Sequence, residues 1–216
     1  MTTQNYEYYG LMVKYWDLLR GDTSNWDDRF FFLDVVKKYG GPVLDVGCGA
    51  GRLILDFLSL GFDIDGVDNS PEMISLCKQN GEKKGLHLNL YLQRMTELDL
   101  PRRYQTILVP SSSFQLLLDE SLPLIAMKRF FDHLLPGGVL AMPFMALWNE
   151  GDPLESEFTQ EAVRPEDSAL VRRTGWTRFN PKTNMEDTRD TWEVIKDGQV
   201  IESEFHEQAP ATRGYT

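Results

Sequence analysis

The sequence has 216 residues, of which 42% are hydrophobic and 25% are charged, and its formal net charge is −11 at pH 7. That composition is typical of one folded globular domain and excludes a chain that is disordered throughout. The acidic balance disfavours nucleic acid as a partner, because such binding depends on clustered Lys and Arg. No apolar run approaches the roughly 20 residues that are needed to span a bilayer.

The two cysteines, Cys48 and Cys77, stand outside any CxxC or Cys/His cluster. The sequence therefore predicts neither a structural zinc site nor a disulfide framework, and we expect no bound metal. The first ten residues lack the basic start and the apolar core of a signal peptide. These features together predict a cytoplasmic protein with reduced thiols and no membrane partner.

The first forty residues predict two helices. Aromatic and apolar residues recur at helical spacing from Tyr8 to Leu19, which predicts a helix that ends near Gly21. Residues 24–41 predict a second helix, with acidic residues near its start, lysines in its last turn and a Gly pair that stops it.

From residue 42 to residue 145, short apolar runs alternate with helical patterns. Ser70 and Pro71 have the residue types of an N-cap and a first helical position. Short buried strands that alternate with helices predict a Rossmann-like, doubly wound α/β fold with a mostly parallel sheet. The expected strands are 42–46, 62–68, 86–92, 104–110 and 138–145, and the expected helices are 51–61, 70–85 and a helix from 121 that breaks at Pro136.

Beyond residue 147 the pattern changes. Residues 147–168 are acidic and predict a loop, whereas 169–180, 187–198 and 199–208 predict three antiparallel strands appended to the sheet. These strands would form either a lid over the site or a structural appendage. We therefore expect a single domain over residues 1–216, divided into a helical cap (1–40), a cofactor-binding core (41–147) and substrate-side strands (148–216).

The stretch VLDVGCGAGRL (Val43–Leu53) joins the first expected strand to a helix. Its glycines could cradle a dinucleotide, hold another nucleoside or merely make a tight turn. The spacing is GxGxG rather than the dinucleotide pattern GxGxxG, and no GK[ST] follows as in a P-loop. Asp68 ends the second strand, where a carboxylate can accept hydrogen bonds from both ribose hydroxyls. Acidic residues near the loop, among them Asp63 and Asp65, would repel a pyrophosphate if they faced the site. They would not repel the cationic S-adenosylmethionine.

The pieces VLDVGCGAGR, GVDNSPEMI and HLLPGGVLAM together resemble the cofactor-binding half of class I S-adenosylmethionine-dependent methyltransferases. The resemblance implies that three glycines line the methionine and ribose, that Asp45 supports their loop through hydrogen bonds, and that Asp68 holds the ribose hydroxyls. Asn69 and Met73 would lie near the adenine. The cofactor set implied in this way is Asp45, Gly47, Cys48, Gly49, Gly51, Asp68, Asn69, Met73, Met95 and Ser111.

The sequence departs from the family at one contact. After the third strand the family commonly has an acidic residue that contacts the adenine amino group, and this chain has Arg94 there. Because an arginine cannot accept a hydrogen bond, we expect the Met95 backbone to contact the adenine instead.

The segment LVPSSSFQLL after the fourth strand lacks the Asn/Asp-Pro-Pro-Tyr motif of enzymes that methylate nucleic-acid or protein amides. It is more similar to the branch that acts on small molecules, which would make Ser113 and Phe114 walls of the substrate pocket. The other interpretation is a polar helix start followed by one core aromatic side chain.

No residue stands out as a catalytic base. The candidates are His206, which reaches the site only if the C-terminal strands form a lid, and Tyr15, whose aromatic neighbours could close over the cofactor.

We therefore expect transfer of a methyl group from S-adenosylmethionine to an O or N atom of a small molecule by in-line displacement. The alternatives are a non-catalytic nucleoside-binding or assembly module with the same fold, and an NAD-dependent oxidoreductase. Family members usually continue beyond the antiparallel strands with a helix and two more strands. The sequence therefore indicates either a shortened fold or a second copy, in a homodimer, over the edge of the fifth strand.

Overall fold

The computed structural model describes residues 8–215. The chain folds into two compact units. Within the described residues, the first comprises Tyr8–Tyr9, Asp22–Phe114 and Asp119–Pro143, and the second comprises Gly10–Gly21, Gln115–Leu118 and Phe144–Tyr215. The division into a cap, a core and substrate-side strands stays a prediction.

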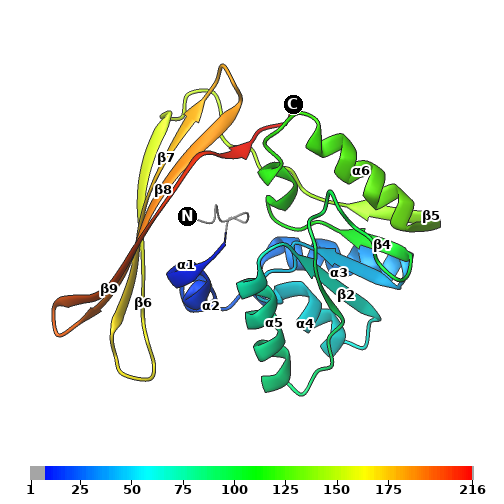
Figure 1. The fold of residues 1–216 in the computed structure, drawn as a ribbon, viewed down its shortest axis with the longest axis horizontal. Coiled ribbons are helices and arrows are strands. Elements are labelled where there is room, and N and C mark those ends of the chain that lie inside the picture. The colour runs from blue at the N-terminus through cyan, green and yellow to red at the C-terminus, as the bar shows by residue number, and fades with distance from the viewer. Residues whose placement is uncertain (1–7, 216) are drawn as a thin grey trace. The chain divides into compact units, whose positions relative to one another are not determined.

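The first unit is built on a five-stranded sheet of order β3-β2-β1-β4-β5, in which every neighbouring pair is parallel. Helices pack along this sheet, as Figure 1 shows. Together with the separate antiparallel sheet, this confirms the predicted fold class. The strands are β1 (Val43–Val46), β2 (Ile64–Asp68), β3 (Leu90–Leu92), β4 (Tyr104–Leu108) and β5 (Leu134–Ala141), and the helices are α3 (Asp27–Tyr39), α4 (Arg52–Ser59), α5 (Pro71–Lys83) and α6 (Leu122–His133). The 3-10 turn η1 (Ser113–Leu116) begins in this unit, and its last two residues are assigned to the second.

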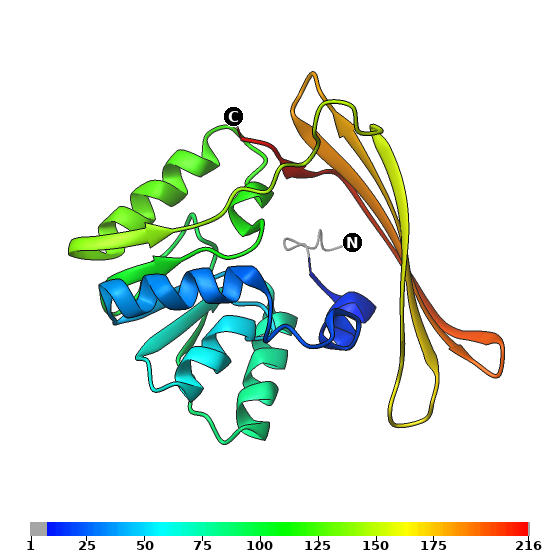
Figure 2. The same ribbon diagram turned by 180° about the vertical axis from the view of Figure 1, so that it is seen from behind.

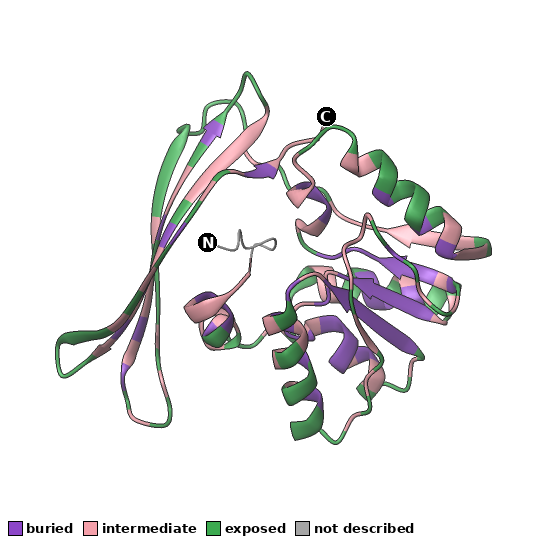
Figure 3. Ribbon diagram, in the orientation of Figure 1, coloured by how far each residue is buried: buried purple, intermediate pink, exposed green. Residues whose placement is uncertain are grey.

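The central strands lie in the core of this unit. Every residue of β1 and β2 is buried, and these strands stand out among the buried segments in Figure 3. Strands that are covered on both faces of a sheet consist of near-continuous runs of apolar residues. The sequences VLDV and IDGVD are such runs except for their aspartates. Side chains from α3, α4 and α5, such as Phe32, Phe57 and Cys77, complete this core.

Two predicted helix signals are present in the structure. Helix α3 has Asp27 and Asp28 in its first turn and lysines in its last, and it ends at Gly40 with a φ of 84°. Helix α5 begins with Ser70 as N-cap, whose Oγ accepts a hydrogen bond from the Met73 N–H at 3.1 Å.

The helix predicted from residue 121 to a break at Pro136 ends three residues earlier in the structure. Helix α6 ends at His133, and the LLPGG stretch already belongs to β5. A residue before proline is disfavoured in the helical conformation, and this ends the helix ahead of Pro136. The register then shifts: Tyr104 pairs with Leu134, but Thr106 pairs with Val139, so the Pro-Gly-Gly segment bulges from this edge strand.

The second unit is built on an antiparallel sheet of order β6-β7-β8-β9, seen from both sides in Figures 1 and 2. Its strands are β6 (Glu155–Val163), β7 (Leu170–Asn180), β8 (Met185–Lys196) and β9 (Gln199–Arg213). The loop predicted over residues 147–168 is therefore wrong for β6. Nearly all side chains of this edge strand are exposed, and so its sequence lacks the apolar alternation that signals a strand.

The predicted first helix is two short helices, α1 (Gly10–Lys14) and α2 (Trp16–Arg20). Tyr15 interrupts them with φ −114° and ψ 13°, outside the helical range. The C-cap at Gly21 agrees with the predicted end. None of the helices in the described range 8–215 is long and apolar enough to cross a membrane.

Candidate functional site

The strand order of the first unit reverses between β1 and β4, where open parallel sheets bind ligands beyond the carboxyl ends of their strands. The glycine loop follows β1 and the serine segment follows β4. A Cβ built on Gly47 would lie 2.7 Å from the Ser113 Oγ, so the two segments meet at this reversal.

The glycine loop is held against β2 by its backbone. The N–H groups of Gly47 and Cys48 both donate to the Val67 carbonyl, at 2.8 and 3.1 Å. Gly47, Gly49 and Gly51 all have positive φ, which other residues rarely adopt.

Two of these glycines have opposite surroundings. A Cβ on Gly51 would lie 2.8 Å from both Cys77 Sγ and Leu55 Cδ1, so glycine is needed there for packing against α4 and α5. A Cβ on Gly49 would meet no atom of residues 8–215 within 4 Å. The Gly49 side of the loop is therefore open to a ligand that approaches the backbone.

Asp68 connects the end of β2 to this loop. One carboxylate oxygen accepts from the Gly49 N–H and the other from the Ser70 N–H, both at 2.9 Å. Ser70 Oγ in turn donates to the Tyr8 carbonyl at 2.7 Å. Each carboxylate oxygen has two lone pairs, so Asp68 can still accept hydrogen bonds from a ligand. Sequence reasoning did not foresee the Ser70 and Tyr8 contacts, since hydrogen bonds to main-chain atoms leave no residue pattern.

Asp45 is only 1% exposed, and neither of its carboxylate oxygens has a hydrogen-bond partner in the part of the chain that the structure describes. Its expected role in supporting the loop through hydrogen bonds stays a prediction. Burial raises its pKa from 3.8 to about 7; the charge of Arg52 and the nearby Ile54 N–H oppose this rise, and the charge of Asp68 adds to it. A cationic or hydrogen-bonding ligand would stabilise the ionised form of such a buried carboxyl.

Asp63 and Asp65, which the sequence left as acidic groups near the site, lie at the opposite end of β2 from Asp68. Arg102 donates to both carboxylates at 2.7–2.8 Å, and the Tyr104 hydroxyl donates to Asp65 at 2.9 Å. Because these charges are paired with Arg102 at the far end of the strand, Asp63 and Asp65 do not meet the condition on which they would repel a pyrophosphate.

Arg52, at the last position of the glycine stretch before Leu53, has a structural partner. Its guanidinium donates through two nitrogens to the Asp28 carboxylate and lies 5.2 Å from the ring centre of Trp26. The side chain is 9% exposed. Arg52 therefore fixes the start of α4 to the start of α3.

Cys48 and Cys77 are both buried free thiols. A hydrogen bond with Cys77 and burial raise the pKa of Cys48 well above its usual value, which makes this thiol unreactive.

The remaining cofactor candidates differ in how closely the structure ties them to the loop. Met73 is 2% exposed and is connected to Asp68 through Ser70. Asn69 and Met95 follow β2 and β3 at the same carboxyl edge of the sheet. Ser111 is exposed and has a φ of 57°, a strained conformation that is common at functional sites.

The two substrate-pocket candidates also differ. Ser113 lies against Gly47, and its Oγ donates to the Pro110 carbonyl at 2.9 Å. Phe114 is 4% exposed and packs on Phe130 of α6 with ring centres 6.3 Å apart. This packing agrees with the interpretation of Phe114 as a core aromatic side chain.

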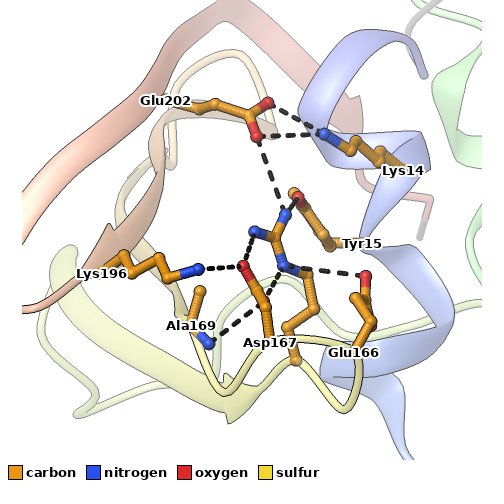
Figure 4. Close-up of polar contacts among 8 residues, drawn as sticks. Lys14, Tyr15, Glu166, Asp167, Ala169, Lys196 and Glu202 are labelled. Carbon is orange, nitrogen blue, oxygen red and sulfur yellow. Dashed lines mark hydrogen bonds and ion pairs between the residues drawn. The ribbon is translucent and has the colours of Figure 1, made fainter.

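Tyr15, a catalytic candidate, lies in a polar cluster of the second unit (Figure 4). Its hydroxyl accepts a hydrogen bond from Arg164 at 2.6 Å, and Arg164 also binds Asp167 through two nitrogens at 2.7 Å. Lys14, one residue earlier, donates to Glu202 on β9 at 2.9 Å. Tyr15 is itself 4% exposed. These contacts give it a role in holding α1 and α2 to the antiparallel sheet.

His206, the other catalytic candidate, is 3% exposed on β9. It pairs in register with Asp190 of β8, and its Nε2 lies 3.6 Å from a Glu204 oxygen. Its catalytic role stays a prediction. No group of three or more His, Cys, Asp or Glu side chains that could hold a metal ion is present within residues 8–215.

Comparison with known proteins agrees with this geometry. Residues 43–138 match a family model described as a methyltransferase domain. A glycine/sarcosine N-methyltransferase from Halorhodospira halochloris is 32% identical over 145 residues, which are 63% of this chain and 52% of that protein. The chain thus spans about half the length of the curated relatives it matches.

Solved structures share the fold. An S-adenosylmethionine-dependent methyltransferase from Clostridium acetobutylicum superposes with a TM-score of 0.72 at 21% identity over 94% of this chain and 79% of its own. A sugar N-methyltransferase from a Streptoalloteichus species gives 0.71 at 20% identity over 100% and 85%. Residues 43–138 therefore match a methyltransferase domain, and the chain shares the fold of solved S-adenosylmethionine-dependent methyltransferases.

Proposed function

We propose that this protein binds S-adenosylmethionine at the glycine loop and transfers its methyl group to a small molecule. One observation carries the proposal: the open backbone at Gly49 lies beside a carboxylate, Asp68, at the point where the strand order reverses. A nucleoside with its ribose on Asp68 would lie along the glycines, which have no side chains to obstruct it.

Asp45 supports the choice of this cofactor. A buried carboxyl without a hydrogen-bond partner in the described chain favours a cationic ligand over a pyrophosphate. The ammonium group of S-adenosylmethionine would supply that charge and hold Asp45 in its ionised form. The residues of the loop thus fit the group that the methyltransferase domain implies.

Bound S-adenosylmethionine supplies a methyl group already activated by a sulfonium. The protein has to align the acceptor with that methyl and exclude water, and alignment of this kind contributes roughly 7–11 kcal/mol in favourable cases. Asp68 and the loop glycines would fix the nucleoside end, and Asn69, Met73, Met95 and Ser111 would complete its surroundings. Ser113, beside Gly47, would face the acceptor side.

A small-molecule acceptor is supported by the proteins that this chain resembles, which include a glycine/sarcosine N-methyltransferase and sugar N-methyltransferases. The net charge of −11 disfavours nucleic acid as the methyl acceptor. A homodimer over the β5 edge is supported by exposed apolar side chains on the neighbouring α6, where Leu124 and Phe131 are each 76% exposed.

Incubation with isotopically labelled S-adenosylmethionine and a panel of small amines and hydroxyl compounds tests the proposal. We expect label in at least one acceptor, with formation of the demethylated cofactor, and much less label with Asp68→Ala at the same cofactor concentration. A protein that binds the cofactor but labels no acceptor in a broad panel would favour the non-catalytic module. A protein that binds NAD instead would overturn the assignment of the site.

A further inference from the structure

Glu186 occupies an unusual position in the antiparallel sheet. It lies near the start of β8 and pairs in register with Phe179 of β7 on one side and with Thr212 of β9 on the other. Side chains directly opposite in neighbouring antiparallel strands share a face of the sheet. Phe179 and Thr212 are each 9% exposed, so the Glu186 side chain stands between two nearly buried neighbours.

One aromatic side chain lies beside Glu186 in the sheet, and a second ring stacks on it. Phe179 stacks on Trp148, with ring centres 5.7 Å apart and ring planes within 9°. The Trp148 indole N–H donates to the Asp152 carbonyl at 2.8 Å, which fixes the ring. A carboxylate next to oriented aromatic rings is the combination that recognises organic cations.

Strand β9, which pairs with β8 beside Glu186, contains a bulge. Glu186 pairs with Thr212, but Thr188 pairs with Gln208, so three residues of β9 lie opposite Asp187 alone. Bulges of this kind interrupt the ladder and re-aim side chains, and they are frequent beside binding sites. The bulge therefore gives the edge of β9 next to Glu186 an irregular surface.

Several acidic side chains of this sheet have an arginine partner that Glu186 lacks. Asp187 pairs with Arg178, Asp190 with Arg173, and Glu207 with Arg189, at 2.6–2.9 Å. Within the described residues, the side chain of Glu186 makes neither an ion pair nor a hydrogen bond, although it is partly buried. Burial raises the pKa of Glu186, because the ionised carboxylate loses hydration there.

We propose that Glu186, Phe179 and Trp148 form a site on the antiparallel sheet that binds a protonated organic amine. This inference goes beyond the proposed function and does not depend on it, because all three residues belong to the second unit. The ammonium group supplies the missing positive charge to Glu186, and the adjoining aromatic pair adds cation–π attraction. A hydroxyl in place of the amine offers no charge, so the site prefers amine-bearing molecules over their hydroxyl counterparts.

Two pairs of probes test the site without the cofactor: glucosamine with glucose, and cyclohexylamine with cyclohexanol. Binding is followed by NMR through the resonances of Glu186, Phe179 and the Trp148 indole at neutral pH. We expect an amine of at least one pair to shift these resonances and to bind at least about tenfold more tightly than its neutral counterpart.

The variant Glu186→Gln keeps the shape and removes the charge, and Glu193→Gln removes the same charge from the opposite face of the same strand. We expect Glu186→Gln to weaken amine binding at least about tenfold and Glu193→Gln to leave it unchanged. Thermal unfolding is expected to show both variants folded, because Glu186→Gln removes a partly buried charge that has no partner within the described residues.

Equal binding of amine and neutral probes, no shift by either amine, or equal loss in the two variants would overturn the site. Because these titrations contain no S-adenosylmethionine, their failure leaves cofactor binding and methyl transfer open to their own tests. Conversely, a protein that does not bind the cofactor could still show the amine preference at Glu186.

Discussion

Asp45→Asn should make the unliganded protein more stable at alkaline pH. The wild-type carboxyl has a pKa of about 7 in the folded protein, against an ordinary value of 3.8. Since the folded state holds this proton more tightly than the unfolded state, the free energy of unfolding falls as the pH rises from about 4 to about 7. Above about pH 7 the ionised carboxylate lowers the free energy of unfolding by an amount that no longer changes with pH.

The size of the effect follows from the pKa. A rise of about 3 pKa units, at about 1.4 kcal/mol for each unit, destabilises the folded protein by about 4 kcal/mol above pH 7. Asparagine has nearly the same shape and never ionises, so the variant avoids this loss. At about pH 4, where the wild-type carboxyl is protonated in the folded state, the two proteins should be nearly equal in stability.

Urea unfolding of both proteins at a series of pH values measures this difference. Asp63→Asn is a control of opposite sign, because Arg102 lowers the pKa of Asp63 and the carboxylate therefore stabilises the folded state at neutral pH. The reasoning fails if Asp45→Asn is less stable than the wild type at about pH 8, or if the difference does not depend on pH. The same variant should bind S-adenosylmethionine more weakly, since the neutral amide cannot balance the ammonium group.

Three further predictions concern the neighbouring contacts. Gly49→Ala should lower cofactor affinity in calorimetry and cost about 1 to 2 kcal/mol of stability, because alanine must adopt a φ of 53° and its methyl points into the open side of the loop; unchanged binding would mean that the ligand does not lie there. Arg52→Ala and Asp28→Ala should each destabilise the protein by about 2 kcal/mol, with a coupling energy of about 1 kcal/mol in a double-mutant cycle of urea unfolding; additive effects would show that the pair does not act as a unit. Tyr15→Phe should cost about 1 kcal/mol through loss of the Arg164 hydrogen bond while methyl transfer persists; loss of turnover in a folded variant would instead support a catalytic role for Tyr15.

The doubly wound core could be predicted from the sequence because its signals are local. Short apolar runs are buried on both faces of the sheet, and Ser70 and Gly40 mark helix ends with specific backbone geometry. The glycine loop and Asp68 could be placed because the carboxyl ends of β1 and β2 meet at one edge of a parallel sheet.

Two elements were misjudged for local reasons: strand β6 is an exposed edge without apolar alternation, and α6 ends three residues before Pro136. The other features that the sequence could not supply depend on partners distant along the chain. The pairing of Asp63 and Asp65 with Arg102 joins residues almost forty positions apart, and no local pattern announces it. The isolation of Asp45 and of Glu186 likewise appears only when all their neighbours are placed.

Calorimetric titration of the protein with S-adenosylmethionine, with its demethylated product and with NAD tests the central claim most directly. We expect both S-adenosyl compounds to bind one site and NAD not to bind. Asp68→Ala should reduce affinity at least about tenfold, because the ribose loses its carboxylate and Gly49 loses a hydrogen-bond acceptor. Failure of the wild type to bind either S-adenosyl compound, or equal binding by Asp68→Ala, would contradict the assignment of the glycine loop as the cofactor site.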